Sequence, residues 1–304
     1  MFAAPPELPC RVRFEIPGAH RAAGRHSDWF FGKDDQRAHS FLEGPAVDRD
    51  GHLWVTDIPF GRLFRISPEG EWHLALEYDG EPNGLAIHRD GRVFIADHKR
   101  GLLVHDPRSG SLEIVLGRLR REGFKGLNDL TFARNGDLYF TDQGQTGLQD
   151  ASGRLYRLRA TDGQVDCLLD NVPSPNGLVL TPDERHLLLA VTRANQVWRL
   201  PLHQDGTTSK VAAFIQLSGG LAGPDGMAMA ADGSLAVAHC GLGTVWVFSR
   251  LGEPIFRIRS PHGLSTTNCC FDGNRLLITE SDSGCVLEAE LPVAGAVLHS
   301  HMTG

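Results

Sequence analysis

Six residues with oxygen-bearing side chains recur along this chain at spacings that could bring them together around one cation. They are separated by 40, 45, 48, 49 and 43 residues, and each begins a similar short apolar segment. Two carry carboxyl groups and four carry amides, and such oxygen ligands suit a hard cation. We expect one divalent metal ion, with Ca²⁺ first and Mg²⁺, Mn²⁺, Zn²⁺ or Fe²⁺ as alternatives. We call these six residues the starter ring: Glu43, Asn83, Asn128, Asn176, Asp225 and Asn268.

The segments that follow the starters share one pattern. In the first five copies a turn residue, Asp or Asn, comes seven positions after the starter, as at Asp50 and Asp90. Four of these five turn residues are followed by Gly, and Asp-Gly or Asn-Gly between short apolar runs predicts a β-hairpin. Alternating runs predict a third strand in every copy and a fourth in the first five, such as residues 62–67 and 71–76. A four-stranded unit with this period is typical of a β-propeller blade.

The fold is therefore predicted to be all-β, as one domain over residues 1–304 that forms a six-bladed β-propeller with four antiparallel strands per blade. The sixth unit lacks a fourth strand, whereas residues 11–16 alternate like a strand that has no neighbour. We expect this N-terminal strand to complete the sixth blade and close the ring, which would remove an exposed edge. Residues 1–40 supply this strand and an arm, of which 18–40 should form a surface segment or a lid. The blades begin near residues 43, 83, 128, 176, 225 and 268.

Composition excludes several classes of protein. The 304 residues include 37 acidic and 30 basic side chains, a net charge of −7 that does not favour nucleic-acid binding. The apolar runs are too short to span a membrane, and the first residues lack the apolar stretch of a signal peptide. Six Cys without CxxC spacing predict reduced thiols in a cytoplasmic protein. We expect a monomer or homodimer that acts on a small molecule.

The propeller prediction brings the starter ring to one mouth of the central channel, because the innermost strand of each blade runs along that channel. Asn and Asp at strand starts often only bond the backbone of tight turns. Six aligned polar residues favour a metal site instead, since an unpaired acid such as Glu43 or Asp225 near the axis is costly to bury.

Four short motifs around the starters carry a family resemblance. They are Glu43-Gly44-Pro45, Leu127-Asn128-Asp129, Pro175-Asn176-Gly177-Leu178 and Pro224-Asp225-Gly226-Met227. In order and approximate spacing they resemble those of the SMP-30/gluconolactonase/luciferin-regenerating-enzyme-like family, over about residues 40–291. The resemblance implies a six-bladed propeller with one divalent metal in its channel and lactone hydrolysis as the activity. It also implies that Glu43, Asn176 and Asp225 bind the metal, and that Asn128 is a fourth ligand or binds substrate.

The resemblance has one departure. Sugar-lactonase members usually carry an Arg two positions before the Asn of the second motif, where it contacts sugar hydroxyls. Here that position is Gly126, preceded by Lys125. We expect Asn83, Asn128, His98 and Lys125 to line the substrate site.

The expected mechanism begins with a cation that polarises the lactone carbonyl as a Lewis acid. Asp225 then removes a proton from the attacking water, or attacks the carbonyl itself. Two alternatives remain open: a calcium-dependent hydrolase of organophosphates or other esters with the same site, and a non-catalytic propeller that binds a metal or a protein partner.

Other polar residues have simpler interpretations. Asp57, Asp97 and Asp142 end the second strands of their units, where they are expected to cap turns. His239 also follows a second strand, and a structural role is expected for it. The His299-Ser300-His301 segment lies in the C-terminal tail and is expected to be frayed.

Overall fold

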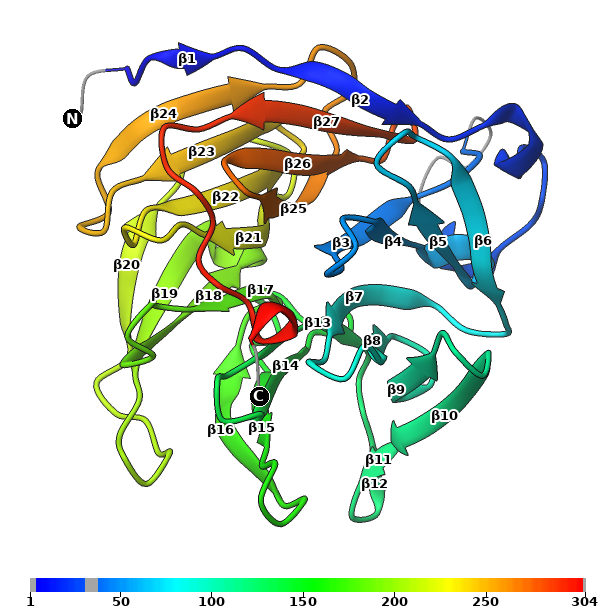
Figure 1. Cartoon of the computed structure of the whole chain (residues 1–304). Coiled ribbons are helices and arrows are strands. Elements are labelled where there is room, and N and C mark those ends of the chain that lie inside the picture. The colour runs from blue at the N-terminus through cyan, green and yellow to red at the C-terminus, as the bar shows by residue number, and fades with distance from the viewer. Residues whose placement is uncertain (1–3, 31–37, 303–304) are drawn as a thin grey trace.

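The computed structural model describes residues 4–30 and 38–302, and it forms six antiparallel sheets arranged as blades around a central axis (Figure 1). The first blade contains β3 (Leu42–Val47), β4 (Leu53–Asp57), β5 (Arg62–Ile66) and β6 (Trp72–Glu77). The second contains β7 (Pro82–Ile87), β8 (Val93–Asp97), β9 (Gly101–Asp106) and β10 (Ser111–Leu116). The third contains β13 (Leu127–Phe132), β14 (Leu138–Asp142), β15 (Gly153–Leu158) and β16 (Val165–Val172).

The other three blades repeat this order. The fourth contains β17 (Pro175–Leu180), β18 (His186–Val191), β19 (Gln196–Pro201) and β20 (Ala212–Gln216). The fifth contains β21 (Gly223–Met229), β22 (Leu235–Cys240), β23 (Thr244–Phe248) and β24 (Pro254–Arg259). The sixth contains β25 (Thr266–Asp272), β26 (Arg275–Glu280) and β27 (Cys285–Glu290). A small hairpin, β11 (Arg118–Leu119) and β12 (Glu122–Gly123), lies between the second and third blades.

The N-terminal strand closes the propeller as predicted. Strand β2 (Arg11–Glu15) pairs antiparallel with β27 and becomes the outer strand of the sixth blade. The Arg11 guanidinium lies 2.7 Å from the Glu288 carboxylate across this pair. One strand was not predicted: β1 (Glu7–Leu8) pairs in parallel with β24 on the outer edge of the fifth blade. The first residues of the chain therefore bind two neighbouring blades.

Packing between adjacent blades supplies the hydrophobic core. Alternate strand residues point into the seams between sheets, and Leu, Val and Ile dominate the buried clusters there. The aromatic side chains of Trp54, Phe94 and Tyr139 are buried in this core, whereas Trp198 and Trp246 are partly exposed. The hairpin glycines have the positive φ that their turns require, with +80° at Gly51 and +91° at Gly91.

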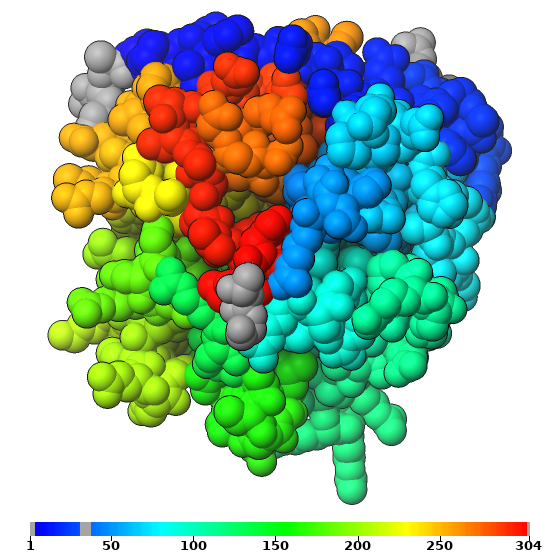
Figure 2. All heavy atoms as spheres, viewed as in Figure 1, coloured from blue at the N-terminus to red at the C-terminus, as the bar shows by residue number. Residues whose placement is uncertain are grey.

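The C-terminal tail is ordered, so the prediction that it frays was wrong. The tail crosses one face of the propeller and reaches the centre of that face (Figures 1 and 2). Its backbone bonds to loops at the ends of inner strands: the Ala296 amide donates to the Met229 carbonyl at 2.9 Å. The Arg49 Nε donates to the Ser300 carbonyl at 2.6 Å. The tail ends in a short 3₁₀ helix, η5 (His299–His301), in which His299 is only 4% exposed.

The remaining 3₁₀ helices lie in loops. They are η1 (Gly18–His20), η2 (Asp28–Phe30), η3 (Ile58–Phe60) and η4 (Thr192–Ala194). Helix η2 packs against η3, which places this part of the N-terminal arm beside the end of β4. Residues 31–37 of the segment predicted as a surface element or lid lie outside the described residues. In the described part of the chain, all six cysteines are free and no helix is long and apolar enough to cross a membrane.

Candidate metal centre

The first residues of the six inner strands converge at the end of the channel opposite the tail. The tail contacts residues at or beyond the carboxyl ends of these strands, such as Met229 and Arg49, whereas the starters lie near their amino ends. Glu43, Asn128, Asn176 and Asn268 are buried, and Asp225 and Asn83 are partly exposed. The structure thus brings the predicted ring to one mouth.

Threonine hydroxyls link blades and fix the backbone of the ring. The Thr56 hydroxyl in the first blade donates to the Asn83 carbonyl of the second at 2.6 Å. Equivalent bonds cross three other seams, from Thr141 to Asn176 at 3.0 Å, from Thr192 to Pro224 at 2.8 Å and from Thr267 to Leu42 at 2.9 Å. Each bond satisfies a buried carbonyl at or beside a starter, so hydrogen bonds from an adjacent blade hold the backbone of the ring.

Glycine follows the starter in four blades because the next blade packs against that position. A Cβ atom at Gly226 would lie 1.9 Å from the side-chain oxygen of Asn268. A Cβ at Gly44 would lie 2.6 Å from the carbonyl of Asn83, and one at Gly177 would lie 2.5 Å from that of Asp225. Real Cβ atoms do not come so close to other atoms, so these glycines set how near neighbouring inner strands can approach.

Gly226 offers a direct test of this packing. Gly226→Ala is expected to lower the free energy of unfolding by about 1–3 kcal/mol, because overpacking forces the inner strands apart. Chemical denaturation measures the change. Gly123→Ala is the matched control, since a Cβ there meets nothing within 4 Å. Equal stabilities of the two variants would contradict the packing argument.

Asp129 is an acid of the channel that sequence reasoning missed. It follows starter Asn128 where four other blades have Gly, and its carboxyl group occupies the space over Gly84, 2.2 Å from where a Cβ would lie. The side chain is buried, and its Oδ1 accepts a bond from the Leu130 amide at 2.8 Å. A signal was present, because an Asp replaces Gly at an otherwise repeated position.

Asn268 joins two of the acids. Its Nδ2 donates to Glu43 Oε2 at 2.9 Å and to Asp129 Oδ2 at 3.3 Å. Its Oδ1 accepts the Cys269 amide at 2.8 Å, which occupies one of the two lone pairs of this oxygen. In this arrangement Asn268 holds two carboxyl groups in place, although the sequence pattern grouped it with the oxygen donors.

Three acids thus gather near the channel mouth. Burial raises the pKa of each, and repulsion by neighbouring carboxylates adds to this effect for Glu43 and Asp225. Burial raises the pKa of Asp129 to about 7. Burial and then the negative charges of Asp225 and Asp129 raise the pKa of Glu43 well above its usual range. The pKa of Asp225 is raised by burial and by the charge of Asp129, while hydrogen bonds from Asn176 and the Cys240 thiol act in the opposite direction.

The donor set fits a divalent cation. Among residues 4–30 and 38–302, no ion pair joins Glu43, Asp129 or Asp225 to a basic side chain. Buried carboxylates without a countercharge are unfavourable, and a bound cation would reverse the effect of their repulsion. Carboxylate and amide oxygens are ligands that Ca²⁺ and Mg²⁺ accept.

A chain of amides orients Asn128. Its Nδ2 donates to Gln143 Oε1 at 2.9 Å, and the Gln143 Nε2 donates to the Ser174 hydroxyl at 3.0 Å. Because the NH₂ group of Asn128 donates to Gln143, its Oδ1 is the atom that remains available to a ligand. Gln143 was not predicted, since nothing in its local sequence separates it from a loop residue.

The structure places the other predicted site residues around this mouth. The ring of His98 lies over Gly126, where a Cβ would be 2.2 Å from His98 Cε1, so an Arg at this position would displace the imidazole. Lys125 is exposed. Their roles in substrate binding stay predictions.

The acids at the ends of the second strands act as caps, in agreement with their interpretation. The Phe41 amide donates to Asp57 at 2.7 Å, the Tyr78 hydroxyl to Asp97 at 2.8 Å and the Gly126 amide to Asp142 at 2.9 Å. His239 is also structural: its ring accepts the Trp246 indole N–H at 3.2 Å.

One other acidic group lies at the opposite end of the first blade. Asp48, Asp50 and His52 come within ligand distance of one another at the turn between β3 and β4. The Arg65 guanidinium lies 3.0 Å from Asp48 and 3.6 Å from Asp50, so a protein cation already offsets part of this charge. The group lies apart from the starter ring.

Comparison with known proteins identifies the family. The profile of the SMP-30/Gluconolactonase/LRE-like region matches residues 41–282. This protein belongs to that family. Lactonase drp35 of Staphylococcus aureus is 30% identical over 258 residues, which cover 79% of this chain and 78% of the relative.

Solved structures show the same fold. A calcium-binding protein, regucalcin, from Agrobacterium tumefaciens superposes with a TM-score of 0.76 at 23% identity, covering 99% of this chain and 100% of the other. A gluconolactonase from Xanthomonas campestris superposes with a TM-score of 0.74 at 24% identity, covering 96% and 99% of the two chains. The predicted six-bladed propeller and family are therefore confirmed.

Proposed function

We propose that this protein is a metal-dependent lactonase that opens a small lactone at the starter-ring mouth of its channel. The observation that carries the proposal is the group of Glu43, Asp129 and Asp225, three carboxyl groups with raised pKa values and no basic ion-pair partner among the described residues. Relatives named lactonase support the reaction class. A propeller used only as a scaffold has no need of such a cluster.

Each residue has a proposed role. Glu43, Asn176 and Asp225 would hold the metal directly, with Asn128 Oδ1 as a further ligand or a contact to substrate. A divalent cation held there supplies a Lewis acid that polarises the lactone carbonyl. Asp225 is partly exposed, so a water molecule can reach it, and its carboxylate would take one proton of that water as the oxygen attacks the carbonyl carbon. The bond from that carbon to the ring oxygen would then break, and the ring oxygen would take up the proton from Asp225, which gives the open hydroxy acid.

The assay set strips the protein with chelator and restores Ca²⁺, Mg²⁺, Mn²⁺, Zn²⁺ or Fe²⁺ separately before a panel of lactones is tested. Turnover that depends on an added metal supports the proposal. Turnover of organophosphates or simple esters but not lactones would favour the alternative hydrolase. Metal binding measured by calorimetry without turnover of any of these would favour a non-catalytic propeller. Lactone turnover that persists without metal would contradict the mechanism.

Gln143 should act by positioning Asn128. Gln143→Leu removes the acceptor at 2.9 Å that orients the Asn128 amide, and we expect the affinity for Ca²⁺ to fall by about 10-fold. Gln143→Glu keeps an acceptor and should retain more of the affinity. Isothermal titration calorimetry measures both changes without reference to activity.

A matched control is available in the fourth blade. The Gln196 amide donates to Gln216 at 2.7 Å on the exposed outer part of that blade. Gln196→Leu breaks a similar amide pair away from the ring and should leave Ca²⁺ binding unchanged. If Gln143→Leu binds Ca²⁺ as the wild type does, Gln143 does not position Asn128 as a metal ligand.

A further inference from the structure

The central channel contains a chamber between the starter ring and the C-terminal tail, and both apolar side chains and polar groups line it. Its volume is about 150 Å³, and every inner strand contributes to its wall. Asp129 and Asn268 line the end nearer the ring, and the tail lines the other end. Representative side chains from the six inner strands are Ala46, Ile87, Phe132, Leu180, Met229 and Phe271.

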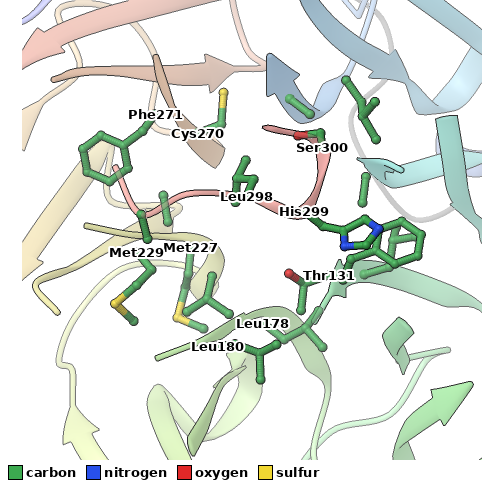
Figure 3. A pocket seen from close by; sticks show the side chains of 18 of the residues that line it. Thr131, Leu178, Leu180, Met227, Met229, Cys270, Phe271, Leu298, His299 and Ser300 are labelled. Carbon is green, nitrogen blue, oxygen red and sulfur yellow. The ribbon is translucent and has the colours of Figure 1, made fainter. Parts of the chain in front are cut away.

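The tail forms one side of the chamber and a route to the surface runs beside it. Figure 3 shows Leu298 and His299 of the tail across the chamber from Leu178 and Leu180. Leu298 is 43% exposed although it lines the chamber, and the exposed Arg134 also lines it. The chamber therefore opens to solvent between the tail and the turn of the third blade, and a small molecule could enter without unfolding a blade.

The size and lining of the chamber define the ligand that it fits. A cavity of this volume can hold a molecule the size of benzene. Met227 and Met229 lie side by side in the wall (Figure 3), and their flexible thioether side chains adapt to different shapes. Burying an anionic ligand in the chamber would be costly, while the carboxyl group of Asp129 at one end can accept one hydroxyl group.

We propose that this chamber is a second binding site, which takes a small neutral aromatic or aliphatic molecule of about seven non-hydrogen atoms with at most one hydroxyl group. The site lies on the tail side of the starter ring and shares Asp129 and Asn268 with the group of acids at the channel mouth. Its ligand enters beside Leu298 and packs against Leu180 and Met229. The inference does not depend on lactonase activity, because it rests on the volume and lining of the chamber and is tested by ligand binding alone.

Phenol and benzoate are the probes, titrated into the full-length protein and followed by NMR chemical shifts of the protein. Phenol is expected to bind at one site with a dissociation constant on the order of 1 mM, and benzoate at least about tenfold more weakly. Leu180→Trp fills the chamber and should abolish the phenol shifts. Leu251→Trp is the matched control, since Leu251 is 71% exposed and does not line the chamber. Its phenol binding should equal that of the wild type.

Two results would overturn the proposal. One is the absence of phenol binding by the wild type, and the other is equal binding by the wild type and Leu180→Trp. If Leu180→Trp fails to fold, Leu298→Ala on the tail gives a second test. It enlarges the chamber and should shift the preference from phenol to 2-naphthol, whereas an unchanged preference would also contradict the proposed site.

Discussion

Asp225→Asn should lower metal-restored lactone turnover by about 10²- to 10⁴-fold, the range typical of losing a positioned general base. The substitution keeps the size of the side chain and an oxygen donor, but its amide cannot accept a proton from water. The partner variant Glu43→Gln should lower turnover through weaker metal binding, so excess metal should rescue it in part. Steady-state kinetics across a metal titration separates the two effects.

Asp232→Asn is the control for this experiment. Asp232 belongs to the same blade, but it lies exposed in the turn at the far end of β21, where it only accepts the Ser234 amide at 2.9 Å. Its turnover should match that of the wild type. Full activity of Asp225→Asn at a wild-type melting temperature would remove Asp225 from the mechanism.

The second large effect is a pH dependence of the metal-free protein. Burial raises the pKa of Asp129 from 3.8 to about 7, so between these values the folded protein binds more protons than the unfolded chain. The derivative of unfolding free energy with pH is then negative, and stability is lost as pH rises through about 4 to 7. Asp225 and Glu43, whose pKa values are also raised, act in the same direction.

We therefore expect the chelated protein to melt several degrees higher at pH 5 than at pH 8, with saturating Ca²⁺ raising the melting temperature most at pH 8. Differential scanning calorimetry at constant ionic strength measures both. Asp129→Asn should flatten the pH profile without metal, because it removes one of the three titrating groups. A metal-free protein that is most stable at pH 8 would contradict the proposed electrostatics.

The starter ring could be predicted because the repeat carries the information. A constant offset from starter to turn fixes which residue begins each inner strand, and propeller symmetry then brings Glu43, Asn176 and Asp225 to one end. Asp129 was not predicted because the repeat was recognised from the starter residues alone. The position after them, where Gly84 and Gly226 stand, faces the neighbouring blade, and a single Asp there enters the channel.

Side-chain direction could not be predicted from the repeat. Asn268 and Asn128 occupy equivalent positions in their blades. Asn268 Oδ1 accepts a backbone amide, whereas Asn128 Oδ1 is turned away from Gln143. The outcome depends on hydrogen-bond partners in other blades. The tail was also misjudged, because its polar residues resemble a frayed end. Its order comes from backbone bonds to Met229 and from Arg49, contacts that span more than 60 and 250 residues.

The pairing of β2 with β27 has a consequence for how the chain folds during synthesis. Arg11 and its partner Glu288 are 277 residues apart, so β2 leaves the ribosome long before β27 exists. At about 5–20 residues per second this interval is roughly 15–55 s. Throughout that time β2 has no strand to pair with, and the growing propeller is an open arc with two exposed edges. Closing the arc is the longest-range step of folding. A chaperone that binds the nascent chain would therefore be most useful before this step, while the two edges are exposed.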